Sequence, residues 1–295
     1  MIKMEKEEVV LKIISYVVVC LFALVCVIPF FVLISGSLSA EESILKYGYS
    51  ILPRDFSLRA YKFILEQPTD ILNAYAVTIF ITIVGTFISL ILTSMAAYAL
   101  SRKDFAWRNK FAFFIYFTTL FSGGLTPWYI LMCNLGMKNN IFALIIPHLF
   151  VVFNILIFRN FVNSIPHEIT ESGMLDGAND IQIFFRLVLP LTKPAMATIG
   201  LFTALTYWNE WYNTMLFITR KELYSLQFYL YDLINNAEAL KQLSVTGANI
   251  DVTNSIPSET VKLAMTIVAT GPIVLVYPFV QKYFISGLVV GSVKG

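Results

Sequence analysis

Six long apolar runs constrain the fold of this chain more than any other feature. They cover roughly residues 12–38, 71–100, 109–132, 140–163, 194–219 and 260–284. A helix that crosses a bilayer needs about 20 apolar residues, and each run reaches that length. Charged residues make up only 14% of the chain, about half the share expected for a soluble domain. The sequence therefore predicts an all-α polytopic membrane protein with six transmembrane helices.

Several of these runs contain residues that break helices. Such breaks survive in lipid where neighbouring helices or a cavity satisfy the freed backbone groups. They fit spans that line a pathway or bend, although ordinary packed membrane helices explain each one equally well. No repeat or low-complexity linker divides the chain, so we expect a single transmembrane domain over residues 1–295. The breaking residues are Pro29, Gly123, Gly124, Pro127, Pro147, Gly271, Pro272 and Pro278.

The short connections indicate an orientation. The connection 101–110 holds four basic residues, whereas the connection 133–140 holds only Lys138. Because short loops rich in Lys and Arg stay in the cytoplasm, 101–110 is expected inside and 133–140 outside. Six spans then place both termini and the loop 164–193 in the cytoplasm, and the segments 39–70 and 220–259 outside. The segment 39–70 carries four basic residues of its own, which weakens the charge argument.

A polar segment from Pro166 to Pro194 interrupts the apolar body between the fourth and fifth runs. It has the pattern of two short helices separated at Asp176-Gly177. Proline suits a first helical turn, and glycine can take the left-handed conformation that ends a helix. Asn179 or Asp180 can cap the second helix. A helix lying on the membrane surface is the alternative, but it would favour Lys and Arg, which residues 166–180 lack.

This polar segment resembles the EAA loop of ABC importer permeases, E-A-A-x(3)-G-x(9)-[IL]-x-L-P. Glu171, Gly177 and the run Leu187-Val188-Leu189-Pro190 match the motif, and Ser172-Gly173 replaces its two alanines. The chain as a whole is similar to the carbohydrate-uptake, maltose-type branch, close to permeases for complex oligosaccharides. The resemblance implies that a coupling helix docks on an ATPase through Glu171, Ser172, Gly173, Asp176, Gly177, Ala178, Phe184 and Pro190.

The resemblance also implies partners and a cellular location. These are a second, similar permease subunit in a heterodimer, an ATPase dimer, an extracellular sugar-binding protein, membrane lipid and a sugar substrate. The location is the bacterial cytoplasmic membrane. The chain has no G-x-x-x-x-G-K-[ST] motif, so ATP hydrolysis is expected on a separate subunit, with ATP and Mg as that subunit's cofactors. This chain is expected to be no enzyme and to hold no cofactor of its own.

The remaining composition gives little support to other chemistry. The net charge of +2 does not argue for nucleic acid, and two histidines leave little scope for a metal cluster. The three cysteines show no metal-ligand spacing and no disulfide framework. We therefore expect neither catalytic nor metal-binding residues. A membrane-embedded enzyme would need a convergent reactive set, which the sequence does not show.

A polar and aromatic cluster in the fifth apolar run is the candidate substrate pathway. It comprises Trp208, Asn209, Glu210, Trp211 and Tyr212. An ionisable group within a span is costly and therefore indicates function, and aromatic faces with amides suit sugars. An interfacial aromatic belt, with Glu210 facing water, is the alternative. Glu210 could also pair with a partner helix.

Two other transport functions stay open at this point. An ion-coupled secondary transporter would show intramembrane charge relays and two similar halves, for which the sequence gives little support. An ABC permease for a solute other than sugar would share the same scaffold.

Overall fold

The computed structural model describes residues 6–66, 68–245 and 258–292, and the regular elements in these ranges are helices. The longest are α1 (Lys6–Ser37), α4 (Pro68–Ser101) and α15 (Ser258–Ser292). The predicted all-α class is confirmed. The other helices are α2 (Glu41–Tyr47), α3 (Arg59–Ile64), α5 (Arg108–Thr118), α6 (Leu125–Asn134), α7 (Phe142–Ile145), η1 (Ile146–His148), α8 (Val152–Asn163), α9 (His167–Leu175), α10 (Asp180–Ile183), η2 (Phe184–Val188), α11 (Leu189–Leu191), α12 (Lys193–Trp208), α13 (Tyr212–Phe217), η3 (Lys221–Leu223) and α14 (Leu226–Val245).

Three helical segments are long and apolar enough to cross a membrane: Val10–Ser37, Pro68–Ser101 and Glu259–Val276. Two bent pairs could add one span each, α7–η1 with α8 at 47° and α10–α11 with α12 at 82°. The part of the chain that the structure describes thus offers up to five spans by length and composition. The count of six stays a prediction.

The run 109–132 differs from the single helix that we expected. It is divided between α5 and α6, with residues 119–124 outside both helices. Gly124 has a φ of +85°, which ends helical geometry at this point. The expected span 194–219 is also interrupted, because α12 ends at Trp208 and α13 begins at Tyr212.

The chain divides into two compact units, Met1–Pro68 with Leu230–Pro272 and Thr69–Tyr229 with Ile273–Gly295. Each unit joins segments that are distant in the sequence, and the single domain over 1–295 stays a prediction. In the first unit, Glu41 accepts hydrogen bonds from the backbone N–H groups of Glu259 and Thr260, at 2.9 and 2.8 Å. This carboxylate caps the first turn of α15, where free N–H groups favour an anion.

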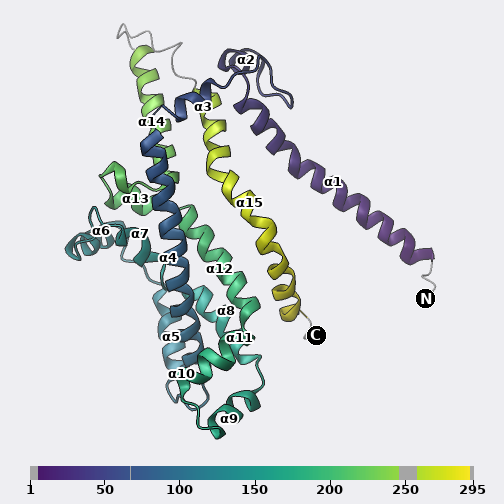
Figure 1. Cartoon of the computed structure of the whole chain (residues 1–295), viewed down its shortest axis with the longest axis vertical. Coiled ribbons are helices and arrows are strands. Elements are labelled where there is room, and N and C mark those ends of the chain that lie inside the picture. Colours follow the sequence, from purple (N-terminus) through teal and green to yellow (C-terminus); the bar gives the residue numbers. More distant parts are fainter. Residues whose placement is uncertain (1–5, 67, 246–257, 293–295) are drawn as a thin grey trace. The chain divides into compact units, whose positions relative to one another are not determined.

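Two apolar cores of the second unit involve α4, and a third joins Met132, Ala143 and Phe217. The larger core joins the end of α4 to α8 and to the helices from α10 to α12, with Phe158, Ile183 and Phe184 at its centre. The smaller core packs Val77 and Ile81 of α4 around Tyr207 of α12. Within this unit, α9 and α10 lie by the end of α4 (Figure 1). α4 therefore contributes to both cores, to the smaller one through its first half and to the larger one through its last turns.

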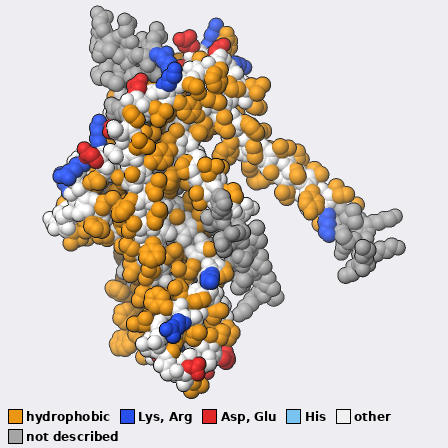
Figure 2. All heavy atoms as spheres, in the orientation of Figure 1, with side chains coloured by type: hydrophobic (Ala, Val, Ile, Leu, Met, Phe, Trp, Pro, Cys, Tyr) orange, Lys and Arg blue, Asp and Glu red, His pale blue; other side chains and the backbone are white. Residues whose placement is uncertain are grey.

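Hydrophobic side chains cover much of the visible surface of the helices, including α1 (Figure 2). Among the described residues, none of the apolar window in α1 is buried. A helix that is apolar all round and exposed would be unstable in water, because nothing would offset the cost of hydrating its side chains. The apolar surface of α1 therefore suits contact with lipid or with other membrane helices.

Candidate functional site

The polar segment after α8 folds as the two predicted short helices, α9 and α10. α9 ends in a Schellman motif, in which the N–H of Ala178 donates to Gly173 O and the N–H of Gly177 donates to Met174 O, both at 3.0 Å. Gly177 has a φ of +80°, the left-handed conformation that this motif needs. Asn179 then forms a capping box with Gln182, with hydrogen bonds of 2.9 and 3.0 Å. The predicted break at Asp176-Gly177 is confirmed.

One side of α9 packs closely on the helices that follow it. Gly173 is buried, and a Cβ at this position would lie 2.8 Å from Leu187 Cδ1. A Cβ here would require the end of the Leu187 side chain to shift, so the position favours a small residue. Ser172 is exposed, and its hydroxyl donates to Ile169 O at 3.1 Å.

The rest of α9 is largely exposed among the described residues and is partly apolar, and Glu171 and Met174 border the open space between α9 and the end of α4. The Leu175 side chain is 89% exposed, and Met174 is also exposed. Glu171 lies on the same helix, with its carboxylate 3.9 Å from His167 Nε2. A rigidly held helix that presents apolar groups beside a carboxylate has the features of a helix that docks in a groove.

The predicted coupling residues fall into two groups. Phe184 is buried in the larger core, where its ring lies 5.4 Å from the ring of Tyr98, and Gly173 is buried under α9. Ala178 is half-buried. These three residues can only support the loop from within. The exposed members, which could touch a partner, are Glu171, Ser172, Asp176, Gly177 and Pro190.

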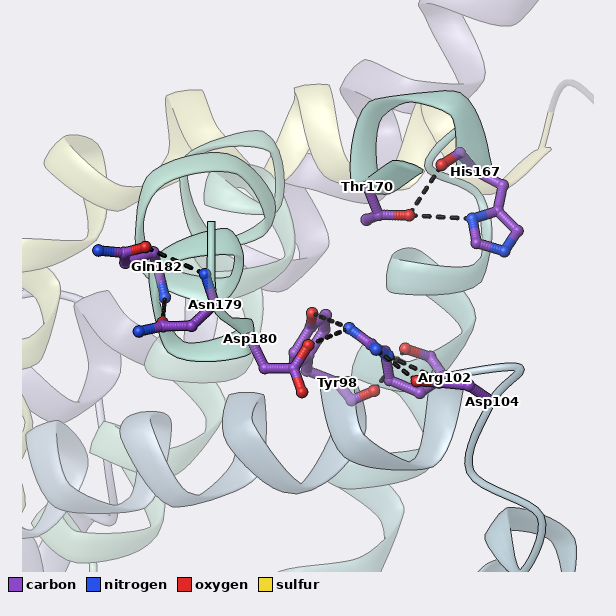
Figure 3. A network of polar contacts seen from close by, with 9 residues as sticks. Tyr98, Arg102, Asp104, His167, Thr170, Asn179, Asp180 and Gln182 are labelled. Carbon is purple, nitrogen blue, oxygen red and sulfur yellow. Dashed lines mark hydrogen bonds and ion pairs between the residues drawn. The ribbon is translucent and has the colours of Figure 1, made fainter. Parts of the chain in front are cut away.

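A polar network next to α10 was not predicted as a site. Arg102, which directly follows α4, contacts the carboxylates of Asp104 and Asp180 and the hydroxyl of Tyr98 (Figure 3). The hydrogen bond with Asp104 raises the pKa of Arg102, and the same contact lowers the pKa of Asp104. In the sequence, Arg102 indicates only the orientation of its loop, because Asp180 is 78 residues away.

A second polar cluster fills the break between α12 and α13. Glu210 is only 4% exposed, and its carboxylate accepts hydrogen bonds from the backbone N–H of Asn213 at 2.6 Å and from Asn213 Nδ2 at 3.0 Å. Its Oε2 lies 2.6 Å from His148 Nε2. The Ser225 hydroxyl donates to the Glu210 carbonyl. Each of these groups satisfies another, as buried polar groups must.

This geometry sorts the predicted pathway residues. Trp208 and Glu210 are buried, whereas Asn209, Trp211 and Tyr212 are exposed. The alternative in which Glu210 faces water is wrong, because the cluster encloses its carboxylate. Glu210 pairs instead within its own chain. The separation of 62 residues conceals the contact of His148 with Glu210 in the sequence.

The Asn209 side chain remains accessible although it has partners. Its amide donates to Leu205 O at 2.8 Å and its carbonyl accepts from Gln227 Nε2 at 3.3 Å. The Trp211 and Tyr212 rings contact each other edge to face, with centroids 5.8 Å apart. This exposed set has the amide and aromatic groups that contact sugars.

Comparison with known proteins identifies the family. No protein-family model matches the chain. The polygalacturonan/rhamnogalacturonan transport system permease protein YtcP of Bacillus subtilis (strain 168) is 39% identical over 277 residues, 93% of this chain and 95% of the relative. Protein LplC of the same organism is 38% identical over 272 residues, covering 92% and 90% of the two chains.

A solved structure agrees with these relatives. It is the crystal structure of a bacterial ABC transporter involved in the import of the acidic polysaccharide alginate, with a TM-score of 0.79 and 34% identity. The match covers 96% of this chain and 100% of the other. The chain belongs to the permease subunits of carbohydrate ABC importers. It is an integral membrane protein, and the relationship supports an ABC importer over an ion-coupled secondary transporter.

Proposed function

We propose that this chain works with a second permease subunit and an ATPase dimer, and that it receives its sugar from an extracellular binding protein. In this assembly ATP and Mg bind to the ATPase, and this chain hydrolyses nothing. Both termini and the α9–α10 loop lie in the cytoplasm. The proposal is supported by the family and by the α9 surface, where a firmly packed helix leaves Leu175 almost wholly exposed.

The docking surface comprises the exposed face of α9 and the turn that follows it. Leu175 and Met174 enter a groove of the ATPase, and Glu171 and Asp176 border this contact. Burying an exposed leucine side chain contributes about 1.5–3 kcal/mol, so Leu175 is expected to be an important contact. Gly173, Ala178 and Phe184 hold the helix in position from below.

The docking surface is tested by Leu175→Asp and Glu171→Lys in the complete importer. We expect both variants to insert in the membrane, to lose most of the ATPase on purification and to lose ATP-driven uptake. Leu52→Asp is the matched control, because Leu52 is an exposed leucine in the segment expected outside. It should retain the ATPase. If Leu175→Asp retains both ATPase and uptake, α9 is not the docking helix.

For the substrate we propose an oligosaccharide from an acidic polysaccharide. YtcP is named for polygalacturonan and rhamnogalacturonan, and the solved importer is described with alginate. The exposed residues Asn209, Trp211 and Tyr212 are the proposed contacts of this chain, and the cluster around Glu210 holds them in place. Competition assays with galacturonate oligomers and neutral glucose oligomers of equal length test the class. Stronger competition by the neutral oligomers would contradict it.

A further inference from the structure

We propose that Arg102 is a positioning residue that carries the displacement of the α9–α10 loop to α4. This inference rests on the proposed coupling role of the loop. The chain itself joins the loop to α8 on one side and, through η2 and α11, to α12 on the other. α4 has no such connection, because Asp180 is 78 residues from Arg102. Movement of the loop can reach α4 only through non-covalent contacts.

The guanidinium of Arg102 makes several directed contacts at once. Its Nη1 donates to Asp180 Oδ1 at 2.5 Å and to the Tyr98 hydroxyl at 3.0 Å. Its Nε donates to one carboxylate oxygen of Asp104 at 2.7 Å, and Nη2 donates to the other. Figure 3 shows the group between the end of α4 and the start of α10. Only the planar fork of arginine can hold two carboxylates in this geometry.

Open space on both sides of Arg102 makes this contact important. A cavity of about 420 Å³ separates the end of α4 from α9 and is bordered by Ser101, His167 and Met174. A second cavity, of about 480 Å³, lies between α4 and α10 beside Met95 and Phe185. Arg102 borders both cavities. The larger core also joins the end of α4 to Ile183 and Phe184, with the Tyr98 and Phe184 rings 5.4 Å apart, and Arg102 adds directed polar contacts where this packing gives way to open space.

The Asp180 end of the contact is also held firmly. Asp180 is the first residue of α10, directly after Asn179, whose capping box orders the start of that helix. A carboxylate at this position is further favoured by the free N–H groups of the first turn. Displacement of α10 must therefore either move Arg102 or break its ion pair.

α4 leads from Arg102 towards the polar cluster around Glu210, in the break between α12 and α13. Thr78 lies 24 residues before Arg102, about 36 Å along a helix at 1.5 Å per residue. Its hydroxyl accepts a hydrogen bond from the N–H of Leu226 at 2.8 Å. The preceding residue, Ser225, donates to the carbonyl of Glu210. A rigid helix thus connects the loop with the residues around Glu210.

The test measures sugar imported per ATP hydrolysed by the complete importer in proteoliposomes. Arg102→Gln and Asp180→Asn should keep the ATPase bound and keep ATP hydrolysis within about twofold of wild type, while sugar imported per ATP falls about tenfold. The double variant should be no worse than either single one, because each removes the same contact. Arg102→Lys, which keeps the charge without the fork, should recover part of the loss.

Arg186→Gln is the matched control, since Arg186 is exposed in η2 and makes none of the contacts that Arg102 makes. It should import normally per ATP. If Arg102→Gln fails to fold, Asp180→Asn still tests the contact, because it is isosteric and its side chain is 68% exposed.

Three results would overturn the proposal. The first is unchanged sugar import per ATP in both single variants. The second is a double variant in which the two losses of import per ATP multiply. The third is a lower yield of assembled complex whose import per ATP is normal. Failure of the coupling role itself looks different, because Leu175→Asp would then retain the ATPase. If Leu175→Asp releases the ATPase while the Arg102 variants import normally, only the role of Arg102 is wrong.

Discussion

The break between α12 and α13 and the loop of α9 and α10 both interrupt the apolar body, but they treat polar groups in opposite ways. At the break, Glu210, His148 and Asn213 satisfy one another and are largely removed from solvent. In the loop, the glycine turn and capping box order the backbone, while Leu175 and Glu171 face outward. The polar groups at the break find their partners within the chain, whereas the loop presents an exposed surface that a partner protein can cover.

The difference indicates whether substitutions in each region should affect folding or assembly. A buried carboxylate is tolerable only with all its partners, so changes at the break should act mainly on folding. Exposed side chains of the loop contribute little to folding, and changes there should act mainly on assembly. Stability and transport measured on the same variants therefore separate the two regions.

The largest effect on stability is expected from Glu210→Ala. The substitution removes the acceptor of the Asn213 N–H and leaves the Asn213 side-chain amide and the ring of His148 with only their mutual contact of 3.1 Å. The expected cost is about 3 kcal/mol. Thermal unfolding of the purified importer and the yield of folded protein measure this loss. Asn209→Ala, at the exposed neighbour, should stay within about 0.5 kcal/mol of wild type and yet lower uptake. Equal stability of the two variants would remove the distinction between buried and exposed residues at the break.

A smaller loss is expected from Gly177→Val in the loop. A β-branched residue in the left-handed conformation costs roughly 1–2 kcal/mol, because its Cβ crowds the following carbonyl. Gly177→Asn should cost less, since asparagine tolerates this conformation. Unfolding midpoints of the two variants test the order, and a valine variant as stable as the asparagine variant would contradict the turn.

The smallest effect concerns the pH dependence of the Arg102 network. Hydrogen bonds from Arg102 hold the pKa of Asp104 below its ordinary value of 3.8. A carboxylate with a lowered pKa in the folded state stabilises the fold above its ordinary pKa and loses this contribution as the pH falls through the folded value. The difference in unfolding midpoint between wild type and Asp104→Asn should therefore be constant from about pH 8 to about pH 5 and shrink below about pH 4. A difference that shrinks already near neutral pH would contradict the contact.

Local features of the loop were predictable because their causes lie within a few residues. Gly177 and Asn179 each act on their own turn, so the break in the helix follows from residue types alone. The motif places small residues at Ser172 and Gly173, and the close approach of Leu187 to Gly173 became apparent only in the structure. The buried position of Phe184 did not, because the loop sequence does not say which of its apolar residues face the core.

Contacts between distant segments were not predictable. Glu210 was singled out as a costly charge, but its partner His148 comes from another helix, and the ion pair of Arg102 with Asp180 joins segments 78 residues apart. The division of 109–132 into α5 and α6 was also missed, although Gly123 and Gly124 marked the place.

The sequence by itself determined that this chain is helical and membrane-bound, and where its polar loop turns. These properties depend on apolar length and on the backbone preferences of single residues, which act locally. Only the tertiary structure decided which polar groups are enclosed and which stay exposed, and which helix ends meet. These outcomes depend on which distant side chains the fold brings within hydrogen-bonding distance of each other.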